Sequence, residues 1–123
     1  MRTRLVLPAA FGLVVVLSLS GPALAHARLL EESPTADSVV AAATTELRLH
    51  FSEAFELALT SITLTGSGAM MMATGSPTIA AGDETILLVP LAAPLPGGTY
   101  TVDWHVVAKD GHGTRGSYHF SVR

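Results

Sequence analysis

Apolar and polar residues alternate with a period of two over much of this chain. Between Glu46 and Ser52, the apolar positions 47, 49 and 51 share one face, and the polar positions 48, 50 and 52 share the other. Such alternation is typical of a strand with one buried face. Similar runs predict strands at 61–65, 85–89, 99–107 and 117–122, and a short first strand near 27–30.

Clusters of glycine, proline and small polar residues interrupt these runs and predict turns. They lie at 33–38, 66–68, 74–77, 82–84, 94–98 and 110–116. The stretch from Ala36 to Ala43 is helix-like, although Val39 and Val40 lower its helix propensity. Six or seven short strands in about 100 residues predict an all-β fold, an antiparallel sandwich or barrel of the immunoglobulin-like type.

The first 25 residues follow a different pattern. Arg2 and Arg4 precede an apolar run from Leu5 to Leu19, a helix-breaking Ser-Gly-Pro, and the small residues Ala-Leu-Ala at 23–25. This is the pattern of a cleaved signal peptide, and the run is shorter than the roughly 20 residues that a membrane span needs. We expect residues 1–25 to be removed. Residues 26–123 then form one periplasmic or otherwise extracytoplasmic domain, with no further apolar run of spanning length.

Composition narrows the function classes. Residues 26–123 hold all ten acids but only five of the seven basic residues, which leaves five minus ten, or −5. A nucleic-acid-binding protein would instead need a basic face for the phosphates. The chain has no cysteine, so disulfides, thiolate metal sites and thiol nucleophiles are excluded.

Five histidines in a chain without cysteine direct attention to metal binding. Cleavage after Ala25 would make His26 the first residue, whose α-amine and ring nitrogen can chelate one ion. Nitrogen ligands in a planar array suit Cu(II), which is also at the top of the divalent affinity order. The simpler alternative is that a histidine follows the cleavage site by chance.

A second candidate lies in the glycine-rich turn after the strand at 99–107. Asp110 and His112 are two residues apart, so a curled backbone can direct a carboxylate and an imidazole to one point. The alternative is a polar turn in which Asp110 accepts backbone N–H groups. Combined with His26, the pair would complete a donor set that suits Cu(II) better than Ca²⁺ or Mg²⁺, which prefer oxygen ligands.

Several motifs, specific in combination and in the same order, resemble those of the CopC family of periplasmic copper-binding proteins, also called copper resistance protein C. The matching segments are His26–Leu29, Ser33-Pro34, Leu49–Glu53, Leu95–Trp104, Asp110–His112, Gly116-Ser117 and Phe120–Val122. The resemblance covers essentially all of residues 26–123.

The resemblance implies a small Greek-key β-barrel that binds Cu(II). Its ligands here would be His26, through amine and ring, together with Asp110 and His112. Glu53 matches a family acid close to the copper and would be a second-shell or weak ligand; the alternative is a surface glutamate at a strand end. The family context also implies an inner-membrane copper transporter of CopD type as partner.

Some family members carry a Cu(I) site in a methionine-rich loop, and thioether sulfur suits Cu(I). Met70, Met71 and Met72 lie in the corresponding region. However, consecutive residues in an extended segment alternate sides, and this loop has no histidine. We therefore favour a loop that packs over the barrel edge and do not carry a Cu(I) site across.

The remaining histidines fit other roles. His50, His105 and His119 alternate out of phase with the apolar residues of their strands and are predicted to face away from the core. Trp104 is predicted to be a core residue.

Three function hypotheses follow. The leading one is a non-enzymatic Cu(II) carrier or buffer in copper homeostasis or resistance. The second is a copper monooxygenase with a histidine brace, although a carboxylate in the copper set would occupy the space that oxygen activation needs. The third is an immunoglobulin-like interaction module that binds no metal.

Overall fold

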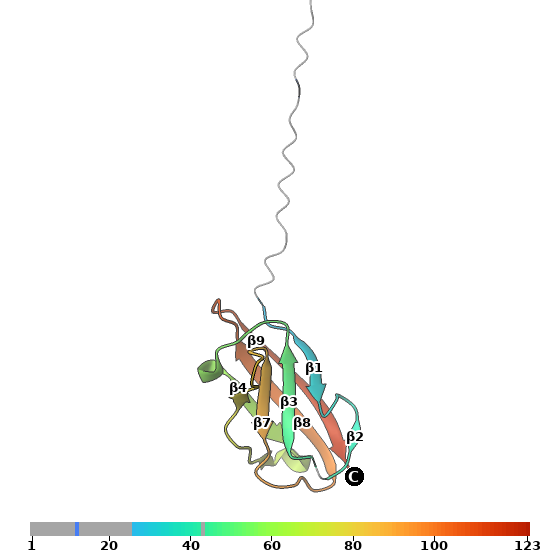
Figure 1. Cartoon of the computed structure of the whole chain (residues 1–123). Helices are drawn as coiled ribbons and strands as arrows, with labels where there is room; N and C mark the ends of the chain where they lie inside the picture. Colours follow the sequence, from blue (N-terminus) through green and yellow to red (C-terminus); the bar gives the residue numbers. More distant parts are fainter. Residues whose placement is uncertain (1–11, 13–25, 43) are drawn as a thin grey trace, which may run out of the picture.

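The alternating runs form strands that pair into two sheets facing each other (Figure 1). A computed structural model describes residues 12, 26–42 and 44–123. In spatial order, the four-stranded sheet contains β1 (Leu29–Ser33), β3 (Glu46–Phe51), β7 (Ile86–Pro90) and β6 (Thr78–Ile79). The five-stranded sheet contains β2 (Val39–Val40), β9 (Gly113–Val122), β8 (Gly98–Val107), β4 (Ser61–Thr65) and β5 (Met71–Met72). Two short 3₁₀ turns complete the described elements, η1 (Leu57–Leu59) and η2 (Ser67–Ala69).

The inward-facing side chains of both sheets form one apolar core. On β3, Leu47, Leu49 and Phe51 are fully buried. Facing them from the five-stranded sheet are Val102 and Val106 of β8, which are also fully buried. Each such side chain contributes about 1.5–3 kcal/mol when removed from water. The predicted all-β, immunoglobulin-like sandwich is confirmed, although the described part has nine strands rather than about seven.

The helix-like interpretation of 36–43 is wrong for its central residues. Val39 and Val40 form β2, which pairs in parallel with Ser121 and Val122 of β9. Two β-branched residues fit an extended strand better than a helix. No helix among the described residues includes them.

The predicted turn at 110–116 ends four residues early. β9 begins at Gly113, and its pairing with β8 runs without interruption from Gly113 opposite Val107 to Val122 opposite Gly98. The glycines at 113 and 116 suggested a turn, but a long neighbouring strand supplies hydrogen-bond partners that override this local preference. β8 and β9 therefore form a hairpin of two ten-residue strands.

The predicted signal peptide lies outside the described residues, Gly12 excepted. In the part of the chain that the structure describes, no helix is long and apolar enough to cross a membrane.

Candidate metal centre

Three segments far apart in the sequence meet at the end of the sandwich where β3 ends and β9 begins. They are residues 26–28, residues 52–56 and the turn 108–112. Backbone hydrogen bonds join the first two, with Ser52 N–H donating to the Arg28 carbonyl at 2.8 Å. The second and third are joined by a bridge between Phe55 and Ala108 and by Lys109 N–H, which donates to the Ala54 carbonyl at 3.3 Å.

The turn between β8 and β9 presents the Asp-Gly-His motif. Ala108 N–H donates to the His112 carbonyl, and Gly111 N–H donates to the Ala108 carbonyl, both at 2.9 Å. Gly111 has φ +94°, a conformation that side chains disfavour and that this tight turn requires. Asp110 and His112 are therefore held at the tip of the hairpin.

Asp110 and His112 form a pair within this turn. One carboxylate oxygen accepts the His112 backbone N–H at 3.0 Å, and the other lies 3.1 Å from the ring Nδ1. These two hydrogen bonds, with a smaller contribution from the nearby His26 ring, hold the pKa of Asp110 below its usual value. The carboxylate is thus kept ionised next to the imidazole.

The ring of His26 lies against the ring of His112. Their centroids are 5.1 Å apart, and the planes meet at 71°. His26 is exposed, but the next residue, Ala27, is buried in the core, which anchors the start of the described segment. The structure therefore brings together all three residues that the sequence suggested as copper ligands.

The spacing of Asp110 and His112 would allow both side chains to bind one metal ion. Two atoms that each lie about 2.0 Å from an ion at right angles stand about 2.8 Å apart. The 3.1 Å between Asp110 Oδ2 and His112 Nδ1 is close to that separation. Among the described residues, no three His, Cys, Asp or Glu side chains converge as a complete metal site. His26 contributes a peptide nitrogen while Ala25 precedes it, and the amine arises only after the predicted cleavage.

Two hydroxyl groups that sequence reasoning missed hold the backbone next to His26. Thr114 Oγ1 donates to the Ala27 carbonyl at 2.7 Å, and Ser52 Oγ accepts Arg28 N–H at 2.8 Å. The alternation had placed Ser52 on the polar face of the strand at 46–52, but β3 ends at Phe51. The available signal was position alone, because Ser52 lies within the matching segment Leu49–Glu53 and Thr114 lies between the segments Asp110–His112 and Gly116-Ser117.

Glu53 lies half-buried in the bend that follows β3. Within the described segments, no hydrogen bond or ion pair joins its side chain to His26, Asp110 or His112. A role near the copper stays a prediction.

Met70, Met71 and Met72 lie near the first residues of β8. The candidate copper ligands His26 and His112 lie at the other end of the sandwich, beyond the last residues of β8. Met71 and Met72 form β5, which pairs with Thr65 and Leu64. Met70 and Met72 both line a pocket of about 170 Å³ beside Tyr100, and Met71 does not. Met70 and Met71 are exposed, whereas Met72 packs against the core. This arrangement agrees with the predicted alternation of the three side chains.

The other histidines face away from the core, as predicted. His119 lies on the outer face of β9, where Nε2 is 2.8 Å from the carboxylate of Asp37. His50 lies 3.9 Å from the Glu31 carboxylate. Trp104, by contrast, packs against Phe51 in the core, with ring centroids 5.2 Å apart.

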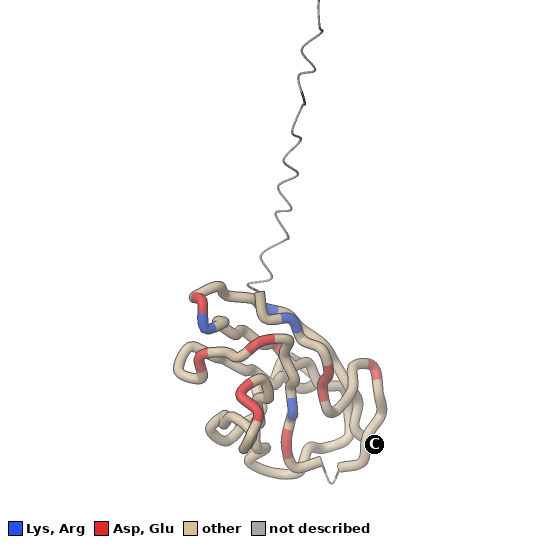
Figure 2. The backbone as a smooth tube through the Cα atoms, turned by 45° about the horizontal axis from the view of Figure 1, so that its top comes forward, with Lys and Arg blue, Asp and Glu red and all other residues tan. Residues whose placement is uncertain are grey.

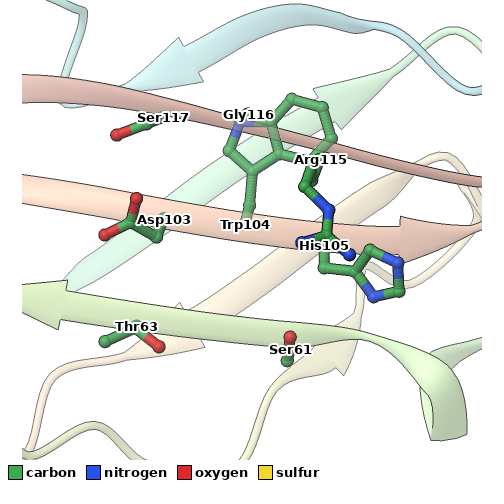
Figure 3. Close-up of a pocket in the computed structure, with 8 residues that line it drawn as sticks. All are labelled: Ser61, Thr63, Asp103, Trp104, His105, Arg115, Gly116 and Ser117. Atoms are coloured by element: carbon green, nitrogen blue, oxygen red, sulfur yellow. The ribbon is translucent and has the colours of Figure 1, made fainter.

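His105 lines an open pocket of about 520 Å³ on the outer face of β4, β8 and β9 (Figure 3). Its polar side chains come from all three strands, and the Arg115 side chain extends toward His105. The pocket residues are Ser61, Thr63, Asp103, Trp104, His105, Arg115, Gly116 and Ser117. None of the predicted copper ligands lines this pocket.

Acidic positions are spread along the whole fold rather than gathered in one patch (Figure 2). Ten acids and five basic residues make the described domain anionic. The electrostatic field of an anionic domain weakly attracts cations of any kind. Selectivity for one metal must therefore come from the donor atoms.

The fold defines a small all-β sandwich, and comparisons with known proteins identify its family. A family model described as the CopC domain matches residues 29–123. Protein YobA of Escherichia coli strain K12 is 41% identical over 111 residues, which is 89% of this chain and 90% of that protein. Copper resistance protein C of Escherichia coli is 37% identical over 116 residues, with the same two shares.

A solved structure agrees with this assignment. The crystal structure of PcoC, a methionine-rich copper resistance protein from Escherichia coli, superimposes with a TM-score of 0.74. The match has 36% sequence identity and covers 80% of this chain and 100% of that one. The chain therefore belongs to the CopC family, and its function is related to copper.

Proposed function

We propose that the protein, after cleavage behind Ala25, binds Cu(II) at the hairpin tip and acts as an extracytoplasmic copper carrier or buffer. The ligands are the amine and imidazole of His26, the imidazole of His112 and the carboxylate of Asp110. The observation that carries this proposal is the contact between the rings of His26 and His112, 5.1 Å apart, beside the Asp110 carboxylate.

The chemistry of the donor set supports copper as the cargo. Three nitrogens and one oxygen in a tetragonal arrangement suit Cu(II). The amine and ring of His26 form a chelate. Only one residue therefore has to be ordered to supply two ligands. An ion between Asp110 and His112 would replace their 3.1 Å contact with bonds to both atoms.

The carrier role rests on the family and on the exposure of the site. Asp110 and His112 have side chains about half exposed, at 40% and 57%. An ion held at such an exposed hairpin tip is accessible to a partner that takes it up. By family resemblance, we propose an inner-membrane copper transporter of CopD type as that partner.

The direct test is titration of Cu(II) into protein that begins at His26 and into a variant with one additional N-terminal residue. Electron paramagnetic resonance reports the nitrogen ligands, and competition with a chelator gives the affinity. The extra residue displaces the amine and should weaken binding strongly. Equal affinity in both proteins would contradict the role of the amine.

Substitutions at the hairpin provide the second test. His112→Ala and Asp110→Ala should each weaken Cu(II) binding. His105→Ala and His119→Ala are matched controls, because they remove histidines from the outer face of the same two strands. Unchanged spectra in His112→Ala would remove that residue from the site.

A further inference from the structure

We propose that Ser52 and Thr114 are positioning residues that hold His26 in place before copper arrives. This inference rests on the proposed function, because it concerns how the same site is assembled. We call these two hydroxyl-bearing residues the N-terminal clamp.

The clamp acts from both sheets on the backbone next to His26. Thr114 belongs to β9 of the five-stranded sheet, and its hydroxyl donates to the Ala27 carbonyl at 2.7 Å. Ser52 follows β3 of the four-stranded sheet, and its hydroxyl accepts Arg28 N–H at 2.8 Å. The Ser52 hydroxyl also lies 3.5 Å from the His26 carbonyl. The two shorter bonds hold the peptide group between Ala27 and Arg28, with Thr114 at its carbonyl and Ser52 at its N–H.

The clamp connects the two proposed ligand histidines by a short path. Thr114 is two residues after His112, and Ala27 directly follows His26. The hydrogen bond between Thr114 and Ala27 therefore sets the distance between the segments that carry the two imidazoles. The buried methyl group of Ala27 reinforces this position from the core side.

The clamp leaves the donor atoms available. It uses the carbonyl oxygens of His26 and Ala27 and the amide of Arg28. The nitrogen and the ring of His26 take no part in it. Every clamp contact lies within residues that remain after the predicted cleavage, so removal of residues 1–25 leaves the clamp intact while it creates the amine.

An unclamped terminus would have to be ordered by the copper ion itself. Ordering the backbone of one residue reduces an equilibrium constant by about tenfold, which corresponds to about 1.4 kcal/mol. Thr114→Val keeps the side-chain shape and removes the hydroxyl, so we expect about tenfold weaker Cu(II) binding. Ser52→Ala should weaken binding by a similar or smaller factor.

The experiment measures Cu(II) affinity by chelator competition in proteins that begin at His26. Thr114→Ser and Ser52→Thr retain the hydroxyls and should bind like the parent. Thr99→Val and Ser121→Ala are matched controls. Their hydroxyls lie 3.2 Å apart and link β8 to β9 at the end of the hairpin far from His112. Both controls should leave the affinity unchanged. Far-UV circular dichroism without metal confirms that each variant is folded.

A second series tests whether the clamp acts through His26. In a His26→Ala background that also carries one additional N-terminal residue, both the ring and the amine of residue 26 are removed, so Thr114→Val should cause no further loss of affinity. An equal loss in both backgrounds would show a general structural effect and overturn the positioning role. If Thr114→Val does not fold, Ser52→Ala in the same two backgrounds decides the question.

The outcomes separate this inference from the proposed function. If His26→Ala weakens binding but Thr114→Val and Ser52→Ala do not, the clamp is wrong and the copper site stands. If His26→Ala binds as tightly as the parent, the proposed site itself is wrong.

Discussion

Gly116 provides a sharp test of the packing beneath the site. It lies on β9 directly opposite Trp104 of β8, and a side chain at this position would point to the inner face, in phase with the buried Tyr118 and Phe120. A methyl group at this position would stand 2.5 Å from Cζ2 and 2.7 Å from Cε2 of the indole. Carbon atoms not bonded to each other need about 3.5–4.0 Å. The indole cannot simply retreat, because Phe51 packs against it with ring centroids 5.2 Å apart.

We predict that Gly116→Ala lowers the free energy of unfolding by about 2 kcal/mol, as overpacking of a core does. For a domain of this size, that corresponds to a fall in Tm of about 10 °C. The sign is informative, because replacing a strand glycine with alanine otherwise raises stability by about 0.5–1 kcal/mol.

The assay is urea unfolding of protein that begins at His26, with far-UV circular dichroism as the measured signal. The same substitution is then made in a Trp104→Phe background, where the smaller ring leaves space and the cost should fall below about 1 kcal/mol. A Gly116→Ala protein as stable as the parent would refute the reasoning. An equal cost in both backgrounds would show that the indole is not the cause.

Three further predictions concern the core and the half-buried carboxylate of Asp83. Phe51→Ala should reduce the free energy of unfolding by about 3–5 kcal/mol in urea titrations, because the ring is fully buried against two aromatic neighbours; a loss under about 1 kcal/mol would contradict this packing. Tyr118→Phe should leave stability unchanged or raise it by about 1 kcal/mol, since the buried hydroxyl has no hydrogen-bond partner among the described residues; a clear loss would reveal one. The hydroxyl and amide of Thr85 lower the pKa of Asp83, so its contribution to stability is present above the unfolded value of about 3.9 and is lost as pH falls through the lower folded value. Asp83→Asn should therefore reduce the acid-induced shift of the urea midpoint, and an unaltered shift would contradict this assignment.

The strands were the most predictable part of the fold. Alternation over 46–51 and 61–65 corresponds to β3 and β4, because each has one face on the core and one in water. β2, β5 and β6 have two residues each, too few for a period to be recognised. The start of β9 was missed because Gly113 and Gly116 carry a turn preference that only the pairing with β8 overrides.

The donor chemistry of the site was likewise present in the chain. His26 behind a predicted cleavage site and the Asp-Gly-His motif predicted nitrogen and oxygen ligands without any structure. The placement of Asp110 beside His112 was also accessible, because it depends on a local turn.

The meeting of the two histidines was decided by the tertiary structure alone. His26 comes within 5.1 Å of His112 because β1 pairs with β3, β9 pairs with β8, and the two sheets close over one core. Residue patterns report which side of a strand is buried, whereas strand order and register depend on how distant segments bury their apolar faces together. The hydroxyls of Ser52 and Thr114, one from each sheet, show the same principle. The sequence shows that both residues carry a hydroxyl, but not that both hydroxyls bind the backbone beside His26. Ala27, the partner of Thr114, lies 87 positions away in the chain.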